Sequence, residues 1–130
     1  MLFRSGVRLD AEMGGVVRAI NFANGQQVDA GEVLVQLDVA VEQAQLRAQE
    51  ATARLAEVEF KRAATLHESG NVPQSQLDRA RADLEKADAE VQNLKAIIER
   101  KAIRAPFSGR VGIRQINLGQ YVAQGAPIVT

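Results

Sequence analysis

The two ends of this 130-residue chain repeat each other, whereas its middle does not. Shifting the sequence against itself so that Gly15 meets Gly109 also places Gly25 on Gly119 and Gly31 on Gly125, without a gap. Further matched pairs are Val17 with Val111, Val28 with Val122 and Leu34 with Ile128. Self-similarity of this kind indicates two copies of one structural unit.

Each copy has the pattern of short β-strands joined by turns. In the first half, apolar and polar residues alternate in 16–22 and 33–37, with a strong Asn-Gly turn signal at 24–25. A half of roughly thirty residues buries too little apolar surface to be stable alone. The sequence therefore predicts one β-sandwich in which residues 1–38 and 103–130 pack face to face.

Residues 39–102 are rich in Ala, Glu, Gln, Arg and Leu, which favours helix. We expect two helical arms, at about 39–69 and 74–102, joined at a tip near 66–75. Three-four spacing predicts one apolar seam on each arm. The first seam is Val41, Ala44, Ala48, Ala51, Leu55 and Val58, and the second is Leu77, Ala80, Leu84, Ala87, Val91, Leu94 and Ile98. The predicted fold class is α+β, a split β-sandwich interrupted by an antiparallel coiled-coil hairpin.

The turn between the arms also has a sequence signature. Gly70 occupies the position expected of the residue that follows a helix end, and Pro73 lies near the start of the second arm.

A further heptad-spaced stripe is predicted on the outside of the hairpin. Large residues recur on the first arm, whereas alanines recur on the second. The stripe comprises Val39, Leu46, Ala53 and Phe60 on the first arm and Ala82, Ala89 and Ala96 on the second. Packing between arms of neighbouring copies would be head-to-tail and would close a ring on rotation. The alternative is that alanine is present for its helix propensity and that Phe60 is an isolated exposed aromatic.

Composition excludes several classes of function. The 16 basic and 16 acidic residues balance and form no basic patch, so no nucleic-acid partner is expected. The chain has no Cys and a single His, His67, with no second ligand or nucleophile at a suitable spacing. We therefore predict no enzymatic activity, metal or cofactor.

A split β module with a helical insertion resembles the periplasmic adaptor, or membrane fusion, proteins. The residues that carry this resemblance are Gly15–Val17, Gly25–Asp38, Ile103–Gly112 and Gly119–Gly125. The same β fold can carry biotin or lipoate on a lysine at a hairpin tip. The lysines here, Lys61, Lys86, Lys95 and Lys101, all lie in the helical insert, which argues against a carrier domain.

The resemblance implies a motif at the hairpin tip that engages the helical end of an outer-membrane channel. Its Arg and Leu positions match Arg62 and Leu66. Its Ser position falls on Pro73, a departure, although Ser75 lies nearby. The alternative is that Arg62 extends from a frayed helix end into solvent and that Leu66 packs the turn.

The implied function is that of an adaptor in a tripartite efflux pump for drugs or other small molecules. Its implied partners are a TolC-like outer-membrane channel, an inner-membrane transporter of the resistance-nodulation-division (RND) type and further copies of itself, arranged as a hexamer. The implied location is the periplasm of a Gram-negative bacterium, with an inner-membrane anchor. Met1–Gly6 is too short for the apolar core of an export signal, and we expect the chain to hold only the two central domains of such an adaptor. Adaptors of type I protein secretion or ABC-type export, and a structural coiled-coil spacer, are the alternatives.

Overall fold

The computed structural model describes residues 8–129, which form two compact units. One unit is built from the two ends of the chain, up to Val39 and from Ile98 onward, and the other is Ala40–Ile97. Residues 1–7, where the first predicted β half begins, and Thr130, the last residue of the second, lie outside the described residues.

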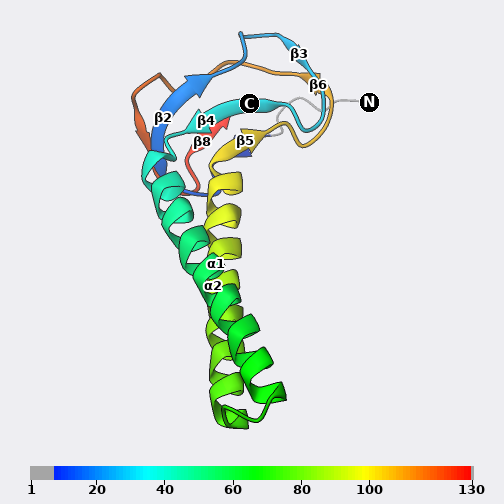
Figure 1. The fold of residues 1–130 in the computed structure, drawn as a ribbon. Helices are drawn as coiled ribbons and strands as arrows, with labels where there is room; N and C mark the ends of the chain where they lie inside the picture. The colour runs from blue at the N-terminus through cyan, green and yellow to red at the C-terminus, as the bar shows by residue number, and fades with distance from the viewer. Residues whose placement is uncertain (1–7, 130) are drawn as a thin grey trace. The chain divides into compact units, whose positions relative to one another are not determined.

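The β unit consists of short strands from both halves of the sequence (Figure 1). The first half contributes β1 (Leu9–Asp10), β2 (Gly15–Ile20), β3 (Gln27–Val28) and β4 (Val33–Leu37). The second half contributes β5 (Ala102–Arg104), β6 (Gly109–Arg110), β7 (Tyr121–Val122) and β8 (Pro127–Val129). One sheet has the order β5-β4-β2-β7, and two antiparallel pairs, β1-β8 and β3-β6, accompany it.

The two halves are joined mainly by strand pairing. Apart from β2 with β4, each described strand pair takes one strand from each half. The sequence predicts two halves stacked face to face, and the structure instead shows them sharing their sheets. The physical reason is that a short strand leaves unpaired amide and carbonyl groups along its edge, and the other half supplies the matching groups.

Reciprocal hydrogen bonds relate the halves by an approximate two-fold symmetry. The Gly25 amide donates to the carbonyl of Val111 at 3.0 Å, and the matched Gly119 amide donates to the carbonyl of Val17 at 2.9 Å. The second glycine pair repeats the exchange, with Gly31 donating to Ala105 and Gly125 to Ala11, both at 2.8 Å. All four glycines have φ between +77° and +86°, the left-handed region that glycine adopts without strain. The sequence repeat is therefore expressed as matching turns and matching contacts.

Matched apolar residues of the repeat fill the core of the β unit. Among the described residues, Val35, Leu37 and Ile128 are completely buried, and no polar or charged residue is buried with them. The remaining core is Ala11, Val17, Phe22, Val28, Leu34, Ile103, Ala105, Val111, Ile116 and Val122. Both halves contribute to it, which explains why neither would be stable alone.

The second unit is a two-helix hairpin of α1 (Ala40–Glu68) and α2 (Gln74–Arg100), of which the last residues of α2, from Ile98, are counted with the first unit. The turn follows a Schellman pattern, because the Asn71 amide donates to the Leu66 carbonyl at 2.7 Å and the Gly70 amide to the His67 carbonyl at 2.9 Å. Gly70 has φ of +81° there, which confirms its predicted place after the helix end.

The seam predicted for the second arm is confirmed. Leu77, Ala87, Val91 and Leu94 are buried, and Ala80, Leu84 and Ile98 are half-buried. Their three-four spacing places them on one side of α2.

The seam predicted for the first arm is wrong. Val41, Leu55 and Val58 are 66%, 59% and 51% exposed, and Ala44, Ala48 and Ala51 are exposed with them. Leu46, Ala53 and Phe60, predicted to lie outside the hairpin, are half-buried, and Ala63 is buried. The guanidinium carbon of Arg81 on α2 lies 5.6 Å from the centroid of the Phe60 ring, so Phe60 faces the second helix.

The cause is that α1 carries two apolar stripes with the same spacing, and spacing alone does not select the one that faces α2. The stripe that faces α2 includes Phe60, whose ring adds the contact with Arg81 to the apolar surface buried in the hairpin, whereas the outer stripe carries only aliphatic side chains.

Candidate functional site

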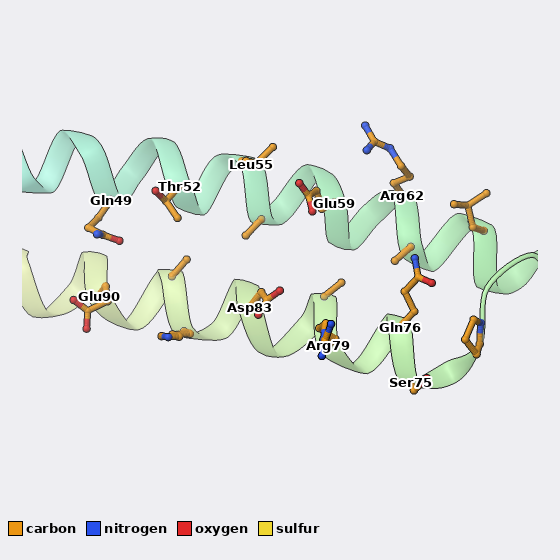
Figure 2. Close-up of a pocket in the computed structure, with 17 residues that line it drawn as sticks. Gln49, Thr52, Leu55, Glu59, Arg62, Ser75, Gln76, Arg79, Asp83 and Glu90 are labelled. Carbon is orange, nitrogen blue, oxygen red and sulfur yellow. The ribbon is translucent and has the colours of Figure 1, made fainter.

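A groove runs along one face of the hairpin between α1 and α2 (Figure 2). It extends from Gln49 and Glu90 to the tip, where Leu66 and Pro73 line its end. On α1 the remaining lining residues are Thr52, Leu55, Ala56, Glu59, Arg62 and Ala63. On α2 they are Ser75, Gln76, Arg79, Ala80, Asp83, Lys86 and Ala87.

Helical spacing explains why these residues lie together. On α1, Leu55, Glu59 and Arg62 recur at steps of three and four, as do Arg79, Asp83 and Lys86 on α2. Residues at such steps lie on one face of a helix. The two antiparallel helices bring the two faces to the same side of the hairpin.

The structure brings the four predicted tip residues together. Arg62, Leu66, Pro73 and Ser75 all line the tip end of the groove. Arg62, Pro73 and Ser75 are exposed, whereas Leu66 is half-buried. Arg62 points away from α2, so its guanidinium is presented to the outside rather than to the second helix (Figure 2).

The turn that carries these residues is held by local hydrogen bonds. The Ser69 hydroxyl donates to the Leu66 carbonyl at 3.0 Å, and Asn71 Nδ2 donates to the Ser69 hydroxyl at 2.8 Å. His67 Nδ1 lies 3.1 Å from the carbonyl oxygen of Val72, which links the end of α1 to the last part of the turn. These bonds fix the backbone from which Leu66 is presented.

Charges of both signs alternate along the groove. Arg62, Arg79 and Lys86 are the basic residues of the lining, and Glu59, Asp83 and Glu90 are the acidic ones. Such a lining can form hydrogen bonds and ion pairs with a partner surface of mixed charge. Sequence analysis identified Arg62 but not the charged residues that line the groove on α2. Their three-four spacing next to the apolar seam of α2 could have indicated them.

Metal-binding side chains are not grouped together in the part of the chain that the structure describes. Within residues 8–129, no group of three or more His, Cys, Asp or Glu side chains is placed to hold a metal ion. Lys61, Lys86 and Lys95 lie on the helices. Lys101 follows α2, and its backbone carbonyl accepts a hydrogen bond from the Leu37 amide at 2.9 Å.

The residues predicted to pack laterally fall into two groups. Leu46 and Phe60 are half-buried within the hairpin, so their assignment to its outer surface is corrected. Ala82, Ala89 and Ala96 are exposed on α2.

Neither of the described helices is both long and apolar enough to cross a membrane.

Residues 5–130 match a family model described as the barrel-sandwich hybrid domain of RND membrane fusion proteins (RND MFP). The chain is 41% identical over 124 residues to an uncharacterized protein of Haemophilus influenzae, a match that covers 95% of this chain and 32% of the relative. It is 30% identical over 141 residues to the multidrug resistance protein MdtA of Proteus mirabilis, with 96% of this chain and 34% of the relative covered. The chain thus spans about a third of the length of these curated relatives.

Two solved structures share the fold. A MacA–MexA chimera that contains the α-hairpin domain of Pseudomonas aeruginosa MexA gives a TM-score of 0.88 at 23% identity, covering 95% of this chain and 46% of the chimera. A putative efflux transporter from Bacteroides eggerthii gives 0.86 at 22% identity, covering 95% and 38%. In both, the shared region includes nearly all of this chain.

Proposed function

The chain belongs to the RND membrane fusion proteins, whose barrel-sandwich hybrid domain it carries, and from this membership we propose that it is part of an efflux adaptor. The adaptor links an inner-membrane transporter of the RND type to an outer-membrane channel and has no catalytic step of its own. The exported molecules are drugs or other small molecules, in line with the name of the MdtA relatives.

The gathering of Arg62, Leu66, Pro73 and Ser75 at the tip end of the groove is the observation that supports this proposal most directly. An exposed guanidinium beside a half-buried aliphatic side chain offers one strong donor and one apolar contact at the end of the hairpin. Such a pair suits the polar end of a helical protein better than a lipid surface, because the groove behind it carries charges of both signs.

The proposal places the protein in the periplasm of a Gram-negative bacterium, anchored to the inner membrane in its full-length form. Several copies, six in the expected assembly, surround the export path. The β unit contributes the wall of the path, and the hairpin reaches the channel through its tip.

Photocrosslinking in cells tests the proposal. A photoreactive amino acid replaces Leu66 in the full-length protein, and the same probe at Gln92 serves as the control, because Gln92 is exposed on α2 but does not line the groove. The expected result is a cross-link from position 66 to an outer-membrane channel and none from position 92. Cross-links from position 66 that reach only other copies of the same chain would contradict the docking role of the tip.

A further inference from the structure

The only Asn-Gly pair of the chain, Asn24–Gly25, lies in an exposed turn of the β unit. In such a pair the backbone nitrogen of the glycine can attack the side-chain amide of the asparagine, because glycine has no Cβ to obstruct the approach. The repeat places Leu118–Gly119 at the matched turn, where this reaction cannot occur because leucine has no side-chain amide. The repeated fold therefore requires the glycine of this turn but not the asparagine.

We propose that Asn24 is a site of spontaneous deamidation and that the second half of the β unit controls the reaction. While the turn is bound to the second half, deamidation is suppressed, and separation of the turn from that half releases it. The inference is independent of the adaptor role, because it concerns the β unit alone.

The reaction needs only water and a base from the solvent. The Gly25 amide nitrogen loses its proton to the base and forms a bond to Asn24 Cγ. The bond from Cγ to Nδ2 then breaks, and ammonia leaves after taking a proton from the solvent. The resulting five-membered imide opens when water adds to one of its two carbonyls, which gives either aspartate or isoaspartate at position 24. One water is consumed and one ammonia is released, with no change of oxidation state.

Contacts with the second half hold the attacking nitrogen. The Gly25 amide donates to the carbonyl oxygen of Val111 at 3.0 Å, so its proton faces a protein acceptor rather than solvent. A hydrogen-bonded amide loses its proton to solvent only after local opening, which is the basis of protection in hydrogen exchange. Arg110 Nη1 donates to the Gly25 carbonyl oxygen at 2.8 Å and fixes the same residue at its other end.

The side chain that would be attacked is held by the second half as well. Asn24 Oδ1 accepts a hydrogen bond from the Arg114 amide at 2.9 Å, which keeps the side chain in one orientation. The attacking nitrogen and the attacked side chain are thus bound to the second half through separate partners. Separation of the turn from that half releases both together.

Solvent reaches the turn without any rearrangement of the core. Asn24 and Gly25 are both exposed, so burial gives the pair no protection. The hydrogen bonds to the second half are then the barrier to reaction. When opening and closing are fast compared with the chemistry, the deamidation rate is the intrinsic rate multiplied by the fraction of time for which the turn is open.

The isoaspartate product prevents the turn from closing as before. It adds one atom to the main chain ahead of Gly25, so the amide and carbonyl of that residue no longer meet Val111 and Arg110 in the same register. These contacts lie beside the β3-β6 pair, in which Gln27 is opposite Arg110. We therefore expect the modification to weaken the pairing of the two halves and to leave a permanent record of an earlier opening.

Mass spectrometry of the full-length protein tests the proposal. The protein is incubated at mildly alkaline pH, either folded or unfolded in guanidinium chloride, and the peptide that contains residues 24 and 25 is analysed over time. Product should form at least about tenfold more slowly in the folded protein, a ratio that a local opening equilibrium readily gives. Equal rates in the two states would overturn control by the second half. Failure of the unfolded protein to react would overturn the modification site itself.

Two matched arginine variants locate the control. Arg110→Ala removes the donor to the Gly25 carbonyl, whereas Arg104→Ala removes the equivalent donor to the Gly31 carbonyl, at 2.9 Å, in the other turn of the first half. Both arginines are exposed, and Arg104→Ala also removes an ion pair with Glu99, so it is a stringent control.

Arg110→Ala should accelerate deamidation at position 24 of the folded protein about two- to tenfold, as expected for the loss of one hydrogen bond that holds the turn. Arg104→Ala should leave the rate unchanged. Equal acceleration by both variants, or by neither, would overturn the assignment of control to the contacts of the Asn24 turn.

Hydrogen exchange measures the same opening directly. The Gly25 amide should exchange slowly in the folded protein and should be accelerated by Arg110→Ala by the same factor as deamidation, because both reactions require its release from Val111. A Gly25 amide that exchanges at the unprotected rate in the folded protein would contradict the proposed control.

Discussion

Arg81 on α2 lies over the ring of Phe60 on α1, with its guanidinium carbon 5.6 Å from the ring centroid. A cation over an aromatic face at this distance is attracted by the ring quadrupole, with about 0.5–1 kcal/mol at an exposed site. The contact links the helices near the tip and identifies which face of α1 is turned toward α2.

Phe60→Ala is expected to destabilise the hairpin by about 2 kcal/mol, because it removes half-buried aromatic surface together with the contact to Arg81. Val58→Ala, two residues away and exposed, should change stability by less than about 0.5 kcal/mol in the monomer. Urea unfolding followed by helical circular dichroism measures both. Equal effects of the two substitutions would contradict the assignment of the inner face.

Gly25→Ala and Gly119→Ala are each expected to lower the free energy of unfolding by about 1–2 kcal/mol. The two effects should be similar, because both positions have positive φ and lie at matched places of the repeat. No atom lies within 4 Å of an added Cβ at either site, so the cost is one of backbone conformation and not of crowding. Asn at the same positions should cost less, since Asn tolerates the left-handed region. Thermal unfolding of the variants measures the difference, and Asn variants no better than Ala would count against a conformational cause.

Leu66→Asp in the full-length protein is expected to reduce channel co-purification at least tenfold and to lower drug resistance in parallel. The substitution places a charge at the half-buried apolar residue of the tip, while the helix itself ends two residues later and tolerates a polar side chain. Gln92→Asp, on exposed α2 away from the groove, is the control and should behave as the unmodified protein. Co-purification unchanged by Leu66→Asp would show that the tip residue makes no essential contact.

Capture of the channel is expected to weaken as salt rises, because charged side chains line the groove behind the tip. Screening becomes effective when the Debye length falls to about 10 Å near 0.1 M salt and to 3 Å near 1 M. Arg79→Gln should flatten this dependence by removing one groove charge, which pull-down at graded salt concentrations measures. A capture yield that does not change with salt would indicate that the groove charges take no part.

The repeat, the turns and the second arm were predictable from the sequence because they depend on local rules. Glycine at matched turn positions requires positive φ wherever it is placed, and Gly70 ends α1 in the same way. The seam of α2 was predictable because α2 has a single strong apolar stripe, which includes Leu77, Val91 and Leu94. Helical spacing also predicts that Arg62 and Leu66, four residues apart, lie on the same side of α1.

Only the tertiary structure decided which stripe of α1 is inside, how the two β halves pair, and that the tip residues share a groove with the charges of α2. The sequence by itself determined the two-fold repeat, the helical insertion and the positions of its turns. Periodicity specifies that a helix has an apolar face but not which of two such faces meets a given partner. That choice depends on the free energy of contacts between residues far apart in the chain, such as the contact of Phe60 on α1 with Arg81 on α2.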